Sequence, residues 1–206
     1  NGEGVPPTRK ELDDRKKLEE KALAENKKLA PMEKIKAAGY YKRCAEQDNV
    51  EGMAKYVKLI LHCPLIEHDD EKVIQLWKKA ADNGNVEMML LYAIRLKTAY
   101  GDEQDVEGSV KYFKMAADNG NLEAMYKCAN MFFKGDGKEI PINKQEAAKY
   151  FKMAADSGHP DSMYQYFKML NEGDGIQQDT EEADKYFKLA LDHKQMDATN
   201  EMALKY

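Results

Sequence analysis

The sequence predicts an all-α fold, a right-handed α-solenoid in which pairs of helices stack on one another. The first observation behind this prediction is a repeated hexapeptide: Ala-Ala-Asp-Asn-Gly-Asn stands at 80–85 and again, unchanged, at 116–121. It returns with substitutions at 154–159 and in a weaker form from Ala190, so successive copies begin 36, 38 and 36 residues apart. A nearly fixed period of this length is typical of supersecondary units stacked in an array.

The second observation is the spacing of apolar residues in the best-preserved unit, 122–156. In its first segment these residues are Ala124, Met125, Cys128, Ala129, Phe132 and Phe133. In its second segment they are Ala147, Ala148, Tyr150, Phe151, Ala154 and Ala155. Because neither segment alternates with a period of two, each is predicted to be an α-helix rather than a strand. The same pattern predicts helix pairs near 50–80, 86–117, 122–156 and 161–192.

The third observation is the placement of residues that end and start helices. Gly-Asp-Gly occurs at 135–137 and at 173–175, where the left-handed conformation that ends a helix favours glycine. Residues that can cap the following helix are Asp70, Asp105, Asn143, and Asp179 or Thr180. The second helices are expected to end at Gly84, Gly120 and Gly158. We call the two helices of each unit the A helix and the B helix.

Each B helix carries large and small residues at fixed positions. The large pairs are Tyr40-Tyr41, Leu76-Trp77, Tyr112-Phe113, Tyr150-Phe151 and Tyr186-Phe187. The small positions are Ala80, Ala116, Ala154 and Ala190. We expect the large residues to fill the space between successive units, and the alanines to let neighbouring helices approach closely. The aromatic residues of the B helices are therefore predicted to be structural.

Composition restricts the function classes. The 206 residues carry a net charge of −5, and the only arginines are Arg9, Arg15, Arg43 and Arg95. Because a nucleic-acid surface needs clustered Arg and Lys, we expect no nucleic-acid partner. No apolar run approaches the roughly 20 residues that span a bilayer, so no direct membrane insertion of this fragment is expected. The chain begins at Asn1, which indicates a fragment of a longer protein whose targeting signals are not visible.

The cysteines and histidines predict neither a metal site nor a catalytic site. The cysteines are Cys44, Cys63 and Cys128. Their odd number and long spacing argue against a disulfide framework and favour a reducing, cytoplasmic compartment, with Cys128 a core thiol. The histidines are His62, His68, His159 and His193. They form no cluster at ligand spacing and no Cys-His or Ser-His-Asp pairing, so we predict no metal, no cofactor and no enzyme activity.

Helical spacing also places apolar and aromatic residues on the concave face of the predicted solenoid, away from the expected core. The residues predicted to bind a partner are Leu91, Ile94, Tyr126, Lys127, Asn130, Phe133, Tyr164 and Lys168. Exposed apolar groups bordered by polar ones mark recognition surfaces, so this set is predicted to line a groove. The alternative is that individual members of the set pack against the A helix of the next unit.

With both helices aligned, the unit resembles the Sel1-like repeat, a relative of the tetratricopeptide repeat with a longer, glycine-containing loop. The residues that carry the resemblance in the third unit are Ala124, Cys128-Ala129, Phe132, Gly135, Gly137, Lys144, Ala147, Tyr150-Phe151, Lys152, Ala154-Ala155 and Gly158. The family commonly has Leu-Gly where this chain has Cys128-Ala129. The fourth unit has Tyr166-Phe167 at that position, and the bulky Phe167 is expected to change the local pitch. The plain tetratricopeptide repeat, of about 34 residues, is the nearest alternative.

The two ends of the chain depart from the repeat. Residues 1–31 are predicted to be a tail and a polar capping or linker helix, and 32–206 to be the repeat array. Pro31 separates the two parts, because the residue before a proline is disfavoured in a helix. The array is expected to begin with a lone B helix at 32–45 and to end with a lone A helix at 197–206.

The resemblance implies a protein–protein interaction scaffold or adaptor, since Sel1-like proteins are known as adaptors in assembly and signalling complexes. We expect a peptide or protein partner to bind in the concave face, where aromatic anchors bury its apolar side chains. One alternative is an accessory repeat arm of a larger enzyme or signalling protein. Another is a small-ligand or cell-wall hydrolase-like Sel1 protein, which the lack of paired cysteines in each unit disfavours. Partner identity and oligomeric state do not follow from the sequence.

Overall fold

The computed structural model describes residues 31–99, 101, 104–135, 139–193 and 198–199. Every long regular element in these ranges is an α-helix, which confirms the predicted all-α class. The chain divides into two compact units, 1–70 and 71–206. The tail and linker helix predicted within 1–31 and the lone A helix predicted at 197–206 lie almost wholly outside the described residues. The division between 1–31 and 32–206 stays a prediction.

The first unit contains α2 (Pro31–Glu46) and α3 (Val50–His62), which pack against each other. The chain order is that of a B helix followed by an A helix. Their contact is close at Gly52, where an added Cβ atom would lie 2.5 Å from the Cβ of Cys44. Only glycine permits this approach, since no real Cβ comes so near another carbon.

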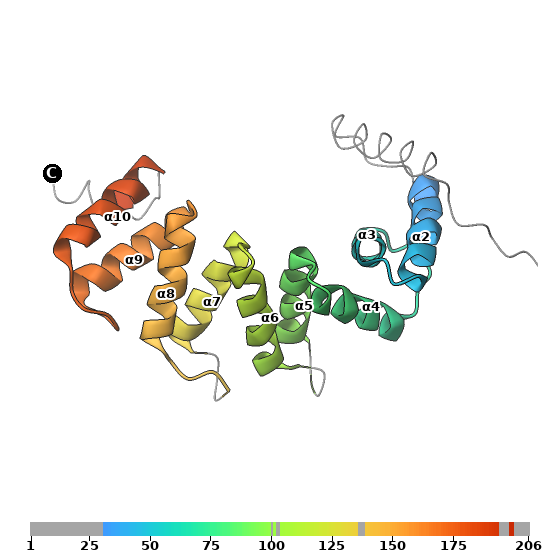
Figure 1. The fold of residues 1–206 in the computed structure, drawn as a ribbon, viewed down its shortest axis with the longest axis horizontal. Coiled ribbons are helices and arrows are strands. Elements are labelled where there is room, and N and C mark those ends of the chain that lie inside the picture. Colours follow the sequence, from blue (N-terminus) through green and yellow to red (C-terminus); the bar gives the residue numbers. More distant parts are fainter. Residues whose placement is uncertain (1–30, 100, 102–103, 136–138, 194–197, 200–206) are drawn as a thin grey trace, which may run out of the picture. The chain divides into compact units, whose positions relative to one another are not determined.

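The second unit contains seven helices among its described residues (Figure 1). They are α4 (Asp70–Asp82), which begins at the unit boundary, α5 (Val86–Thr98), α6 (Val106–Asp118), α7 (Leu122–Lys134), α8 (Lys144–Asp156), α9 (Pro160–Glu172) and α10 (Thr180–Asp192). Helix α5 packs against α6, α7 against α8, and α9 against α10, and each pair packs against the next. The pair predicted near 50–80 falls across the two units and stays a prediction.

The connections alternate between one short turn and one longer loop. The turns from a B helix to the next A helix span three residues each, at 83–85, 119–121 and 157–159. The loops from an A helix to its B helix are longer, at 99–105, 135–143 and 173–179. The extra residues of the 38-residue interval therefore lie in the loop 135–143 and leave the helices themselves unchanged at 13 residues.

The caps explain where these helices begin. Asp105, Asn143 and Asp179 cap the B helices, as the sequence predicts, whereas Asp70 and Thr180 are first helical residues. The A helices are capped by Asn49, Asn85, Asn121 and His159, whose side chains accept a backbone N–H three residues later. The caps predicted from the sequence did not include these four residues. A side-chain acceptor at this position satisfies one of the free N–H groups of the first turn.

The core follows the repeat as predicted for most positions. Ala80, Ala116, Ala154 and Ala190 are all fully buried. The buried members of the aromatic pairs are Tyr40, Trp77, Tyr112, Phe113, Tyr150, Phe151 and Tyr186. Tyr41, Leu76 and Phe187 are only half-buried, so both members of the pair are buried only in the two middle repeats.

Tyrosine hydroxyls link successive repeats of the second unit. The Tyr112 hydroxyl donates to Asp82 Oδ1 at 2.7 Å, and the Tyr186 hydroxyl donates to Asp156 Oδ1 at 2.5 Å. Burial, followed by the hydrogen bond to Asp82, raises the pKa of Tyr112 to about 12. The equivalent hydroxyl of Tyr150 is buried without a hydrogen-bond partner among the described residues. The same tyrosine position is thus bonded in two repeats and unsatisfied in the repeat between them.

Candidate binding pocket between neighbouring A helices

A cavity opens between two successive A helices, α5 and α7, over the B helix α6. Its volume is about 520 Å³. It is lined by Ile94, Lys97, Thr98, Phe113, Tyr126, Lys127, Asn130, Met131, Lys134 and Gly135. We call this cavity the α5–α7 pocket. Four of the eight residues predicted to bind a partner line it: Ile94, Tyr126, Lys127 and Asn130.

The pocket has an apolar floor and a rim that carries positive charge. Phe113 and Met131 are buried, with 1% and 5% of their surface exposed, and form the floor. The rim carries Lys97 and Lys127, which are half-buried, and Lys134, which is exposed. An apolar cavity with a few polar groups at its edge is the usual form of a ligand pocket in a protein.

Tyr126 lines the pocket and packs against two neighbouring rings. Its ring stacks on the His159 imidazole, with centroids 4.4 Å apart, and lies 6.3 Å from the Phe151 ring. The Asn130 side-chain amide donates to the Tyr126 backbone carbonyl at 2.9 Å. Because both residues are fixed by neighbours, their groups present a defined surface to the cavity rather than a mobile one.

His159 combines two structural tasks behind the pocket wall. Its Nδ1 lies 3.2 Å from the Ser162 backbone nitrogen and 3.0 Å from the buried Ser162 hydroxyl, so the imidazole caps α9. Capping requires an unprotonated Nδ1, since only the lone pair can accept the N–H. Burial lowers the pKa of His159, and the nearby Asp161 opposes this shift. The signal that identifies this role is its repeat position, where Asn85 and Asn121 are also caps.

The other four predicted residues lie outside the α5–α7 pocket. Phe133 meets Phe151 edge to face with centroids 5.9 Å apart, and the Lys144 ammonium lies 5.6 Å from the Phe133 ring centre. Tyr164 lies 5.7 Å from the Phe167 ring, with Lys168 Nζ 5.9 Å from the Tyr164 ring centre. Leu91 is half-buried and does not line the pocket. The structure therefore does not bring the eight predicted residues together in one cavity.

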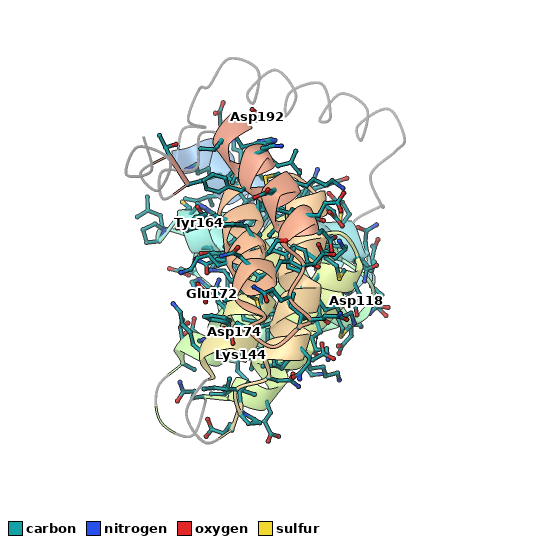
Figure 2. All side chains as sticks on the ribbon, turned by 90° about the vertical axis from the view of Figure 1, so that its left-hand side faces the viewer. Asp118, Lys144, Tyr164, Glu172, Asp174 and Asp192 are labelled. Carbon is teal, nitrogen blue, oxygen red and sulfur yellow. The ribbon has the colours of Figure 1, made fainter. Side chains whose placement is uncertain are left out.

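The neighbouring interval, between α7 and α9, is filled by different side chains. Its position equivalent to Lys97 holds Phe133, whose ring covers Phe151, the equivalent of Phe113. Tyr164 and Glu172 of α9 stand at the repeat positions of Tyr126 and Lys134. Lys144 forms an ion pair with Asp174 (Figure 2). The Lys144 ammonium lies 5.6 Å from the Phe133 ring centre.

Six lining residues were missing from the predicted set: Lys97, Thr98, Phe113, Met131, Lys134 and Gly135. Phe113 had been assigned to the core, and it does lie there, but its edge also forms the pocket floor. The lysines lie in the last turns of α5 and α7. A search for equivalent positions that differ in charge between repeats would have found them.

Other chemistries were also sought in the described residues. No group of three potential metal-ligating side chains occurs among them. Cys128 is buried as predicted, and burial raises the pKa of its thiol to about 12, so the thiol stays protonated at neutral pH. None of the described helices is long and apolar enough to cross a lipid bilayer.

Comparison with known proteins supports the predicted helical repeat. No curated protein sequence matches the chain. A Sel1 repeat protein from Oxalobacter formigenes is similar in structure, with 21% identity, a TM-score of 0.65, and coverage of 82% of this chain and 68% of that one. The protective antigen c5321 of uropathogenic Escherichia coli, which has an SLR fold, shares 23% identity with a TM-score of 0.58 over 74% of this chain and 32% of its own.

The sequence family gives the stronger statement, because it matches most of the chain rather than the fold alone. The Sel1 repeat matches residues 64–85, 88–121, 122–159 and 160–194. The last three matches each contain one A helix and its B helix, in the order that the sequence analysis predicted. The chain belongs to the Sel1 repeat family.

Proposed function

We propose that this chain is a protein-interaction scaffold that holds a segment of a partner protein against its A helices. The observation that carries the proposal is the α5–α7 pocket, which combines an apolar floor with polar groups at its edge. An apolar side chain of the partner enters the cavity and covers Phe113 and Met131. Such anchors supply most of the affinity at protein interfaces, while the polar rim supplies orientation.

The family supports the same class of function, since Sel1 repeat proteins are generally protein-interaction scaffolds. In this proposal Ile94, Tyr126, Lys127 and Asn130 form the central contact. The remaining predicted residues, Leu91, Phe133, Tyr164 and Lys168, extend it over the adjoining surface. We place the protein in a reducing, cytoplasmic compartment, which its three unpaired thiols support.

Ile94→Asp tests this proposal. Selection of displayed random peptides with the wild-type chain is expected to yield peptides that bind. Ile94→Asp is expected to lose these peptides, because a carboxylate in the pocket lining cannot be buried without cost. Leu65→Asp is the matched control, since Leu65 is 62% exposed and lies in the other compact unit. Far-ultraviolet circular dichroism and thermal unfolding check that both variants remain folded.

The proposal is overturned if folded Ile94→Asp selects the same peptides as the wild type, or if no selected peptide depends on Ile94. It is supported if Leu65→Asp retains the wild-type binders and Ile94→Asp loses them at unchanged helicity. A comparison of the two variants separates loss of the contact from a general effect of adding one negative charge.

A further inference from the structure

We infer that the partner segment is an acidic peptide stretch with one large apolar anchor, and that the anchor occupies the α5–α7 pocket. This inference rests on the proposed function and names the chemistry of its partner. It depends on three properties of the pocket: the charge of its rim, the replacement of the three rim lysines at the equivalent positions of the neighbouring interval, and the size of the floor.

The charge of the pocket rim is opposite in sign to the net charge of the whole chain. The chain carries a net charge of −5, yet the lining residues that the structure describes include Lys97, Lys127 and Lys134 and no carboxylate. Lys127 does approach Glu123 of its own helix, with Nζ 3.3 Å from Oε1. Both side chains of this pair are more than a third exposed, so the pair is weak and a partner carboxylate can replace it.

The three rim lysines are not repeated in the next interval, whose lysines, Lys134 and Lys168, stand at the positions of Thr98 and Asn130. At the positions equivalent to Lys97, Lys127 and Lys134, the α7–α9 interval has Phe133, Gln165 and Glu172. The repeat frame alone therefore does not require lysine at any of the three positions. Opposite charges across an interface guide association and exclude partners of the wrong sign, so an acidic segment fits this rim.

The apolar floor of the pocket determines the second feature of the partner, its large apolar anchor. A cavity of about 520 Å³ lies within the range of roughly 300–1,000 Å³ that is typical of protein ligand pockets. Its apolar surface comes from Ile94, Phe113, Tyr126 and Met131, which suit one aromatic or large aliphatic side chain with the backbone beside it. Asn130 uses its side-chain N–H to hold the Tyr126 carbonyl, so its amide oxygen can accept a backbone N–H of the peptide.

Charge reversal of the rim is the decisive experiment. Random displayed peptides are selected with the wild-type chain and with the triple variant Lys97→Glu/Lys127→Glu/Lys134→Glu. The wild type is expected to select peptides in which Asp and Glu flank an apolar residue. The triple variant is expected to select Lys and Arg around the same apolar residue. This exchange of preference requires a folded chain and cannot be produced by unfolding.

The B helices offer a matched control. Lys111, Lys149 and Lys185 occupy equivalent positions of α6, α8 and α10, are exposed, and do not line the pocket. Their reversal to Glu changes the net charge of the molecule by the same amount as the rim variant. The control is expected to keep the wild-type preference for acidic peptides, because its charges lie away from the pocket.

An acidic peptide from the selection gives a quantitative test. Exposed ion pairs contribute about 1.5-fold to 5-fold each in affinity, so Lys97→Gln/Lys127→Gln/Lys134→Gln is expected to weaken binding about ten-fold. The wild-type affinity is expected to fall as salt rises from about 0.05 M to about 0.3 M, and the fall is expected to be smaller in the triple Gln variant.

The outcomes separate this inference from the proposed function. If Ile94→Asp loses all binders but the selected peptides carry no acidic bias, or rim reversal leaves their charge unchanged, the inference is wrong and the scaffold function stands. If Ile94→Asp changes nothing, both are wrong. If the B-helix control reverses the preference as strongly as the rim variant, net charge rather than the pocket selects the peptides, and the inference is again wrong.

Discussion

The α5–α7 interval and the α7–α9 interval are both bounded by helices of 13 residues, yet different side chains fill the space between those helices. One position accounts for much of the difference. Lys97 lies at the rim of the first interval, whereas Phe133, its equivalent, covers Phe151 in the second. The repeat thus determines where neighbouring A helices stand, while a few residues outside the repeat pattern determine which side chains fill the space between them.

The largest expected effect concerns the filled interval. Phe151→Ala removes a buried ring that Tyr126 and Phe133 both approach within 6.3 Å. We expect a loss of about 3–5 kcal/mol in the free energy of unfolding, measured by urea denaturation, because the cavity left behind cannot collapse fully. A loss below about 1 kcal/mol would show that these rings do not support one another.

Exchange of the differing residue tests the comparison itself. Lys97→Phe places a ring where Phe133 stands in the next interval and is expected to fill the α5–α7 pocket. Binding of a peptide selected by the wild type is expected to weaken at least ten-fold, or by about 1.4 kcal/mol, in a titration followed by fluorescence anisotropy. Lys111→Phe, an exposed change on α6, is the control. Unchanged affinity in Lys97→Phe would mean that the cavity is not where the peptide binds.

The tyrosine hydroxyls provide a second contrast between repeats. Tyr112→Phe deletes a hydroxyl that donates to Asp82, and it is expected to cost about 1 kcal/mol of stability. Tyr150→Phe deletes a buried hydroxyl that has no partner among the described residues, so it is expected to be neutral or slightly stabilising. Thermal unfolding of the two variants side by side measures the difference. Equal losses would show that the Tyr150 hydroxyl does have a partner.

The smallest expected effect is a dependence of stability on pH, which the A-helix cap His159 introduces. Burial lowers the pKa of His159 below its usual 6.5, so the unfolded chain binds this proton more tightly than the folded chain. The stability that neutral His159 contributes is therefore present above about pH 6.5 and is lost as the pH falls below that value. His159→Asn keeps a capping side chain of the kind found at Asn85 and Asn121 but does not titrate.

Urea unfolding at about pH 7.5 and about pH 5.5 checks this prediction. The wild type is expected to lose more stability on acidification than His159→Asn. The difference between the two chains isolates His159 from the many carboxylates that also titrate. An equal loss in both would mean that folding does not lower the pKa of His159.

The elements that the sequence predicts well are those set by local patterns. The helical spacing of apolar residues and the glycines at the ends locate the helices, because these signals act within one or two turns. The A-helix caps were missed since Asn85 and Asn121 follow Asn-Gly, which also looks like a turn. The lining of the α5–α7 pocket was predicted only in part, because spacing shows which way Phe133 points but not that Phe151 lies beneath it.

The contrast between turns and loops has a practical consequence. The three-residue turns 83–85, 119–121 and 157–159 fix one repeat on the next, whereas the loops within repeats already differ in length. Inserted sequence, such as an affinity tag or a reporter domain, can be grafted into the loop 173–179 without moving any A helix relative to its neighbour. The same loops allow new specificities to be engineered at the edge of the stack while the helical frame stays untouched.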